Sequence, residues 1–253
     1  MAEFAWVLML GLVAGTLGGI VGFGSSVMLM PALVIVFGPR EAVPIMAVAS
    51  IMANASRVAA WWREVDWRVV AAYSATAAPA AALGAATLLA LPTRSVEAVL
   101  GLFFIAMIPA RRWMARREWR LRLWHLAVFG AGIGLLTGLV ATTGPINAPF
   151  FLAYGLVKGA YLGTEALGSL AMYLAKAITF RSLGALPLET LGKGLVVGSS
   201  LVAGAFIAKR FVRRIDAERF RLLMDALLLV AGLTMLWTAA TAATAATAAN
   251  AAP

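Results

Sequence analysis

The sequence predicts an all-α polytopic membrane protein with two inverted repeats, each a broken or re-entrant helical segment followed by three transmembrane helices. Three observations lead to this fold class. The chain is 62% hydrophobic and only 13% charged, whereas soluble domains are about half apolar and about a quarter charged. Apolar runs at 1–39, 69–92 and 123–157 each exceed the ~20 residues that span a bilayer core. The two halves of the chain also resemble each other.

The excess of basic residues fits a membrane protein better than a nucleic-acid-binding protein. The net charge is +10, but the Lys and Arg residues cluster in short loops beside apolar runs, which is the positive-inside pattern of inner-membrane proteins. The first apolar run contains Glu3 and no nearby Lys or Arg, so it lacks the basic start of a cleaved signal peptide. We therefore expect a retained first span, the lipid bilayer as a partner, and no nucleic acid.

A nearly constant sequence offset relates the two halves. Gly11, Gly15 and Gly19 recur 119 positions later as Gly130, Gly134 and Gly138, and Ser50, Arg57 and Trp61 correspond at the same offset to Ser169, Lys176 and Phe180. Pro31 corresponds to Pro149 at an offset of 118, and Gly38 to Gly155 at 117. Single glycines match by chance in a glycine-rich chain, but an offset preserved over three segments indicates duplication.

Each half is expected to contain one broken segment and three full spans. In the first half these lie at about 4–37, 42–62, 67–90 and 95–110, and in the second at about 123–156, 160–183, 187–208 and 217–238. The chain then divides into a first membrane repeat (1–110), a basic linker (111–122), a second membrane repeat (123–237) and a low-complexity Ala/Thr tail (238–253).

The loop charges predict the topology. The linker 111–122 contains six Arg and one Glu and is expected to be cytoplasmic, together with the basic loops 61–67 and 209–216. The turns 89–93 and 184–187 and both termini are expected outside, with Arg40 as a mild exception. If each broken segment starts and ends on the same side, each half crosses the membrane an odd number of times, so the two halves are inverted.

The two broken segments predict a binding site within the membrane. Ser26 to Phe37 would form a helix of about 18 Å, too short for a core of about 30 Å, and Ile146 to Tyr154 is shorter still. A half-helix that begins inside the membrane presents unpaired N–H groups and positive dipole charge, which suit an anion. The candidate residues at these breaks are Gly24, Ser25, Ser26, Thr142, Thr143, Gly144 and Asn147. The alternative is that the glycines only allow close helix packing.

Two bases lie deep within predicted spans. Ser50, Asn54, Arg57 and Trp61 share one helical face, and Ser169, Tyr173, Lys176 and Phe180 repeat that spacing. We expect Asn54, Arg57, Tyr173 and Lys176 to contribute to the anion site, because a base at this depth needs a partner or a cavity. Snorkelling of both bases to the interface is the alternative. Glu165 and Asp225 are the carboxylates in or near the predicted spans, and a proton-coupling role is the less favoured interpretation of either.

The motif GxxGGxxGFGSSxxxxP from Gly15 to Pro31, followed by SxxxxxSRxxxWWREVDWR from Ser50 to Arg68, resembles the sulfite exporter TauE/SafE family. The resemblance extends from about residue 4 to 237, including the degenerate second copy. It implies a permease of the bacterial inner membrane for sulfur-containing anions such as sulfite, sulfoacetate and other organosulfonates. Coupling to the proton gradient is also implied by the resemblance.

These observations predict a secondary transporter of a small sulfur-containing anion, held mid-membrane by half-helix N-termini and basic residues. An anion channel, or a permease for another small organic anion, remains as the alternative. An enzyme is not expected, because the sequence offers no evident nucleophile–base pair, metal-ligand cluster or phosphate-binding loop. No cofactor or metal is expected, and a homo-oligomer is left open.

Overall fold

The structure is a computed structural model that describes residues 2–21, 25–92, 121–140 and 143–211, with single positions between 95 and 113 and between 229 and 237. Throughout these ranges the regular structure is helical, as expected. The helices are α1 (Ala2–Val21), α2 (Ser25–Phe37), α3 (Pro39–Trp61), the 3₁₀ turn η1 (Trp62–Glu64), α4 (Trp67–Ala90), α6 (Leu123–Leu139), α7 (Gly144–Tyr154), α8 (Lys158–Ser182) and α9 (Leu188–Phe211). The tail, Asp225, most of the linker and most of the span expected at 217–238 lie outside the described residues, as do six positions of the span expected at 95–110.

Several of these helices can cross a membrane. Within the described ranges, three are both long and apolar enough, over Arg40–Glu64, Trp67–Ala90 and Leu188–Ile207. Helix α8 has 25 residues, a length of about 37 Å. Large apolar side chains such as Met9, Ile35, Leu83 and Phe206 are exposed on the outer surface, where lipid would cover them. The chain is a multi-pass membrane protein.

Both broken segments are found where the sequence predicts them. Helix α2 has 13 residues and α7 has 11, so they are about 20 Å and 16 Å long and cannot span a core of about 30 Å. Each is followed by a glycine with positive φ, Gly38 at 75° and Gly155 at 109°. This left-handed conformation ends a helix at low cost only for glycine, which explains the match of Gly38 with Gly155 between the two halves.

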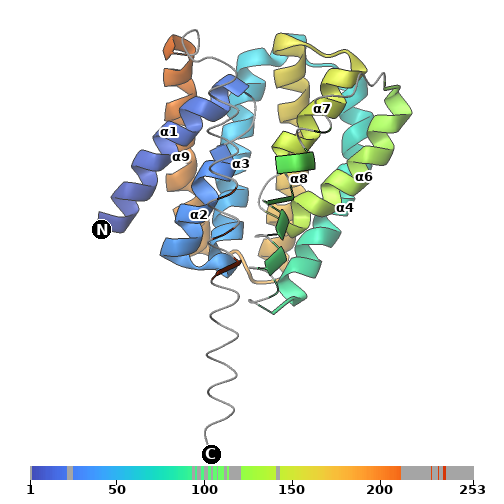
Figure 1. Ribbon diagram of the computed structural model, residues 1–253. Helices are drawn as coiled ribbons and strands as arrows, with labels where there is room; N and C mark the ends of the chain where they lie inside the picture. Colours follow the sequence, from blue (N-terminus) through green and yellow to red (C-terminus); the bar gives the residue numbers. More distant parts are fainter. Residues whose placement is uncertain are drawn as a thin grey trace, which may run out of the picture.

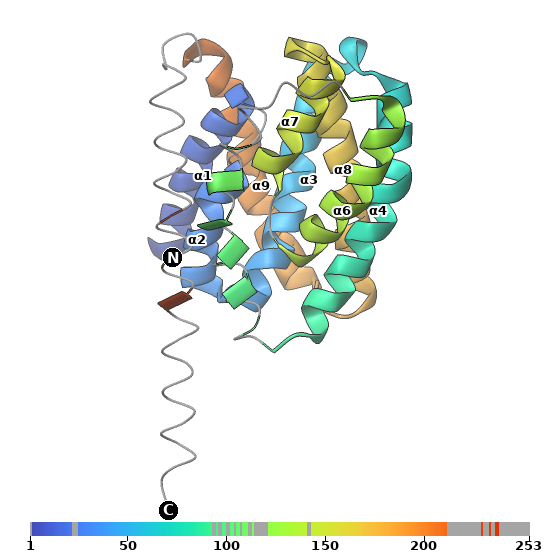
Figure 2. The same cartoon turned by 45° about the vertical axis from the view of Figure 1, so that its right-hand side comes forward.

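Helices α3 and α8 form the centre of the molecule (Figures 1 and 2). Helix α3 contacts α8 and α9, and α8 contacts α3 and α4. Helix α1 packs on α9, and α6 packs on α4. Followed by colour from N- to C-terminus in Figure 1, α1, α3, α7 and α9 run upward, and α2, α4, α6 and α8 run downward. The α3–α4 turn, the start of α6 and the end of α9 lie at one end of the molecule (Figure 1).

The repeated glycines bring these outer helix pairs close together. A Cβ on Gly15 of α1 would lie 2.7 Å from the Cα of Leu201 in α9. A Cβ on Gly134 of α6 would lie 2.8 Å from the Cα of Ala77 in α4. Backbone atoms cannot move aside as a side chain can, so only glycine allows these contacts. Close packing therefore explains these two glycines, and their role is that of small residues at membrane helix interfaces.

Candidate functional site

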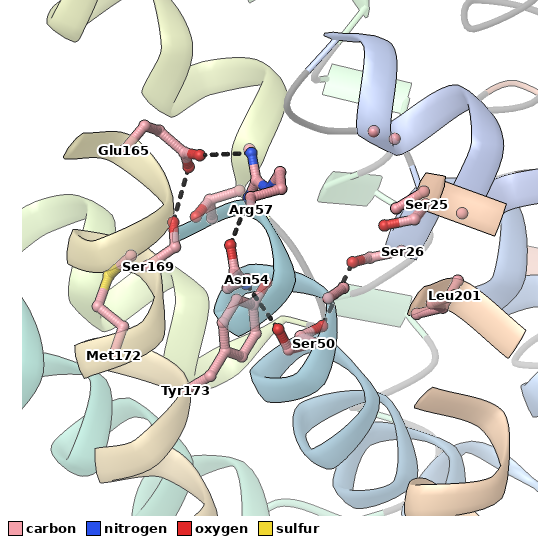
Figure 3. A pocket seen from close by; sticks show the side chains of 17 residues that line it. Ser25, Ser26, Ser50, Asn54, Arg57, Glu165, Ser169, Met172, Tyr173 and Leu201 are labelled. Carbon is pink, nitrogen blue, oxygen red and sulfur yellow. Dashed lines mark hydrogen bonds and ion pairs between the residues drawn. The ribbon is translucent and has the colours of Figure 1, made fainter. Parts of the chain in front are cut away.

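A small polar cavity lies where the two broken segments meet the central helices. It holds about 40 Å³ of water-accessible space, which exceeds the roughly 10–15 Å³ that one water needs. Residues of α1, α2, α3 and α9 line it together with residues from the start of α7 and the middle of α8. The polar side chains of the lining are Ser25, Ser26, Ser50, Asn54, Arg57, Thr143, Glu165, Ser169 and Tyr173 (Figure 3).

The N-termini of both half-helices border this cavity. Ser25 is the first residue of α2, and Gly144 is the first residue of α7 with Thr143 as its N-cap; all three line the cavity. The side chain of Thr143 does not cap α7; its hydroxyl contacts that of Thr137 in the last turn of α6. Two positive dipole ends therefore face the same small space, an arrangement that stabilises an anion.

The polar faces of α3 and α8 supply most of the remaining lining. Ser50, Asn54 and Arg57 are spaced by 4 and 3 residues on α3, and Ser169 and Tyr173 by 4 residues on α8. These spacings place side chains on one face of a helix, and all five residues line the cavity. The expectation of a shared polar face on each helix is thus met by these five residues.

An ion pair joins the two central helices across the cavity. Nη1 of Arg57 donates to Oε2 of Glu165 at 2.9 Å, and the two side chains are 13% and 2% exposed. The other carboxylate oxygen, Oε1, accepts from the hydroxyl of Ser169 at 2.7 Å and from Nδ2 of Asn147 at 3.1 Å. The buried carboxylate is therefore fully partnered, as a charge within a membrane must be.

Hydrogen bonds extend this ion pair along α3 toward α2 (Figure 3). Nη2 of Arg57 donates to Oδ1 of Asn54, and Nδ2 of Asn54 donates to the backbone carbonyl of Ser50 at 2.7 Å. The hydroxyls of Ser50 and Ser26 lie 3.5 Å apart, a weak contact. The orientation of the Arg57 guanidinium is therefore set by Asn54 on its own helix and by Glu165 on α8.

Lys176 has a different environment from Arg57, although the two bases occupy the same repeat position. Its Nζ is fully buried and donates to the carbonyl oxygens of Thr137 and Val140, each at 2.7 Å. These carbonyls belong to the end of α6, where a helix leaves its last C=O groups without intrahelical partners. A cation at that end is also favoured by the helix dipole. Lys176 does not line the cavity, so the two bases do not share it.

The remaining candidates divide into three groups. Asn147 is buried behind the ion pair, where it accepts from the hydroxyl of Tyr73 at 2.9 Å and donates to Glu165. Gly24 and Thr142 lie outside the described residues. The other candidates line the cavity, namely Ser25, Ser26, Asn54, Arg57, Thr143, Gly144 and Tyr173. In the part of the chain that the structure describes, no three His, Asp or Glu side chains are grouped to hold a metal ion.

The pairing of Arg57 with Glu165 was not predicted from the sequence. A signal was present, because a base and an acid inside predicted spans of opposite halves each need a partner. The 108 positions that separate them exceed the reach of any helical spacing rule. The capping of the α6 end by Lys176 was likewise not predicted.

A comparison with known protein families finds a match over most of the chain. The family model described as sulfite exporter TauE/SafE matches residues 7–235, which is most of the chain. No curated protein and no solved structure matches it. The matching family is one of membrane transporters and not of enzymes. This chain therefore belongs to the sulfite exporter TauE/SafE family.

Proposed function

We propose that the protein is a secondary transporter of a small sulfur-containing anion, sulfite or an organosulfonate, which binds in the cavity between the half-helices. The observation that supports this most strongly is the convergence of two half-helix N-termini and the Arg57 guanidinium on one buried space. Discontinuous helices with N-termini at mid-membrane are a recurring way to bind anionic groups in transporters. The family of the chain adds the preference for sulfur-containing anions.

In this proposal Arg57 is the main anion-binding residue. Its planar guanidinium can hold two oxygens of a sulfite or sulfonate group. Ser25, Ser26, Asn54, Thr143 and Tyr173 supply further polar groups, and Gly144 keeps the start of α7 accessible to the anion. Gly24 and Thr142 adjoin this set in the sequence. Asn147 acts through Glu165, and Lys176 adds positive charge behind the α6–α7 break.

The size of the cavity bears on the substrate and on the mechanism. A space of about 40 Å³ is small, so we expect it to take a compact oxyanion more readily than a larger organosulfonate, which requires the surrounding helices to separate. The cavity is bordered by helices of both halves of the chain. Movement of one half against the other would therefore open it to either side of the membrane in turn.

We further propose that 1–110 and 123–237 are inverted repeats joined by a cytoplasmic linker, in the inner membrane of a bacterium. In Figure 1, α1 and α6 run in opposite directions, and so do α3 and α8 as well as α4 and α9. These opposite directions support the inverted arrangement. The main helix contacts of one half are repeated by the equivalent helices of the other: α1 packs on α9 as α6 packs on α4, and α3 contacts α9 as α8 contacts α4. The ends of the segments expected in the cytoplasm also lie together in Figure 1, as the positive-inside rule requires.

The proposal is tested with the purified protein and a panel of sulfite, sulfate, thiosulfate, taurine and sulfoacetate. At least one sulfur-containing anion should raise the unfolding temperature in a concentration-dependent way and be taken up by proteoliposomes. Arg63→Gln, which changes an exposed base of η1, is the matched control and should behave as wild type. A steady anion current across a planar bilayer would indicate a channel instead, and no response to any anion would contradict the proposal.

A further inference from the structure

The ion pair of Arg57 with Glu165 provides the cavity with an anion of its own. Both side chains line the cavity (Figure 3), and Nη1 of Arg57 lies 2.9 Å from Oε2 of Glu165. Among the described residues of the lining, these two carry the formal charges. The guanidinium that a substrate anion would bind is therefore already matched by a carboxylate. An entering anion has to compete with Glu165 for Arg57.

Charge balance makes this competition unfavourable unless a proton takes part. While Arg57 and Glu165 are both ionised, their charges sum to zero, and a bound monovalent anion would leave one net negative charge in the cavity. The Glu165 side chain is 2% exposed, so the little water that can reach it replaces only part of the interaction lost with the guanidinium. A buried carboxylate without a partner charge is strongly unfavourable, and such a group becomes neutral instead.

We propose that Glu165 couples anion binding to proton uptake: the anion replaces its carboxylate on Arg57, and the carboxylate then accepts one proton from the solvent. This inference rests on the proposed function and adds to it the residue that carries the proton. The ionised pair, one anion and one proton give an Arg57–anion pair and a neutral Glu165. One O–H bond forms on Glu165 while one O–H bond of a hydronium ion of the solvent breaks and leaves water, and the net charge of the cavity is the same before and after.

The hydrogen bonds of Glu165 indicate which oxygen accepts the proton. Oε1 keeps its two donors, the hydroxyl of Ser169 and Nδ2 of Asn147, because neither of them binds the incoming anion in this scheme. Oε2 is the oxygen bonded to Arg57, so it is the one that loses its donor. The proton therefore belongs on Oε2. Asn147, which the hydroxyl of Tyr73 in turn holds, acts as a positioning residue for the carboxyl group.

Other ionisable groups near Glu165 do not replace it in this role. The basic and phenolic groups that face it are Arg57 on α3, which is its ion-pair partner, Tyr73 on α4 and Tyr161 on α8; Tyr173 on α8 lines the same cavity. A guanidinium and a phenol are not carboxylates and lose a proton only at high pH in their usual state. Lys176 on α8 is bonded to the carbonyls at the end of α6. Glu64 of η1 borders the start of α8 at Gly159 and is exposed. Within the described lining of the cavity, Glu165 is the carboxylate, and in this proposal it is the group that takes up the proton.

The test measures protons and anions together. Calorimetric titration of the purified full-length protein with sulfite and with methanesulfonate, in buffers of different ionisation enthalpy, gives the number of protons taken up per bound anion. Wild type should take up about one more proton per bound anion than Glu165→Gln does. Any proton that the anion itself gains or loses is the same for both proteins, so it drops out of the difference between them. Glu189→Gln removes a carboxylate that is 79% exposed, and it should take up protons as wild type does.

The pH dependence provides a second readout. Where Glu165 is ionised in the anion-free protein, the affinity of wild type for methanesulfonate should fall about tenfold for each unit by which the pH rises. Glu165→Gln should show no such dependence. Equal proton uptake by wild type and Glu165→Gln would overturn the coupling while leaving anion binding intact.

Two further outcomes keep the inference separate from the proposed function. Failure of every anion to bind wild type would contradict the proposed function and the coupling with it. If Glu165→Gln does not fold, the pH dependence of the anion affinity of wild type decides the matter. It is measured with methanesulfonate, whose single negative charge does not change with pH, or with sulfite after the protonation of sulfite itself has been subtracted. A profile that is flat with pH would overturn the coupling.

Discussion

Replacement of Arg57 by Gln should destabilise the protein strongly, and the structure gives the reason. The substitution removes the partner of the Glu165 carboxylate, which is 2% exposed and 2.9 Å from the guanidinium. Breaking a buried ion pair by removal of one partner costs about 3–5 kcal/mol, because the other group is left buried without a partner charge and must either stay ionised or take up a proton. The two donors to Oε1, Ser169 and Asn147, remain in place, so we expect a value near the lower end of that range.

The double variant Arg57→Gln/Glu165→Gln separates this effect from a mere loss of contacts. It removes both charges, so no unpaired carboxylate remains, and its stability should return toward that of wild type. Thermal unfolding in detergent measures the effect, with a decrease in Tm on the order of 10 °C for the single variant. Arg63→Gln, at an exposed position, controls for loss of a surface base.

The result that would refute this reasoning follows from the snorkelling alternative. A base that only reaches the interface imposes an insertion cost, so its replacement by Gln would leave the stability unchanged or raise it. Wild-type stability of Arg57→Gln would therefore show that the ion pair with Glu165 does not hold α3 and α8 together. A double variant no more stable than the single one would refute the unpaired charge as the cause.

Four further predictions concern the breaks, the glycines and the topology. Lys176→Gln leaves carbonyls at the end of α6 without their cation and should lower stability by about 1–3 kcal/mol in a thermal melt, with less effect on anion affinity than Arg57→Gln. Gly144→Leu should reduce proteoliposome uptake more than membrane insertion, because Gly144 lines the cavity and leucine adds bulk at the N-terminus of α7; uptake equal to that of wild type would make it a packing residue. Gly134→Leu should abolish the folded monodisperse peak in size-exclusion chromatography, since its Cβ would lie 2.8 Å from backbone, whereas Gly132→Leu, with nothing within 4 Å, should not. A periplasm-specific reporter fused to Pro253 should be active, and a cytoplasmic C-terminus would contradict the inverted topology.

The elements of the fold follow from local sequence rules. The half-helices were predicted because Gly, Ser, Thr and Pro interrupt apolar runs and leave stretches too short for the bilayer. The shared faces of Ser50, Asn54 and Arg57 and of Ser169 and Tyr173 follow from the helical period alone. Close packing at Gly15 and Gly134 follows from the spacing of small residues. Each of these properties depends on residues within a few turns of one another.

The partners of the buried charges do not follow from such rules. The helical period places Arg57 on the polar face of α3, but it does not identify Glu165 as the residue opposite. The same limit applies to Lys176, whose repeat position suggested a role like that of Arg57. Backbone carbonyls of α6 bind it instead, and the sequence gives no sign of them because every residue has a carbonyl. Duplicated positions can therefore keep a charge while its partner differs.

The binding of sulfite to two variants tests the central claim most directly. Glu165→Gln keeps the guanidinium of Arg57 and removes its competing carboxylate, while Arg57→Gln/Glu165→Gln removes both charges and leaves no unpaired carboxylate to disturb the fold. A charge-assisted hydrogen bond contributes about 1.5–3 kcal/mol, so the double variant should bind sulfite roughly tenfold to a hundredfold more weakly than Glu165→Gln. Equal dissociation constants for the two folded variants would contradict the account and exclude Arg57 from the anion site.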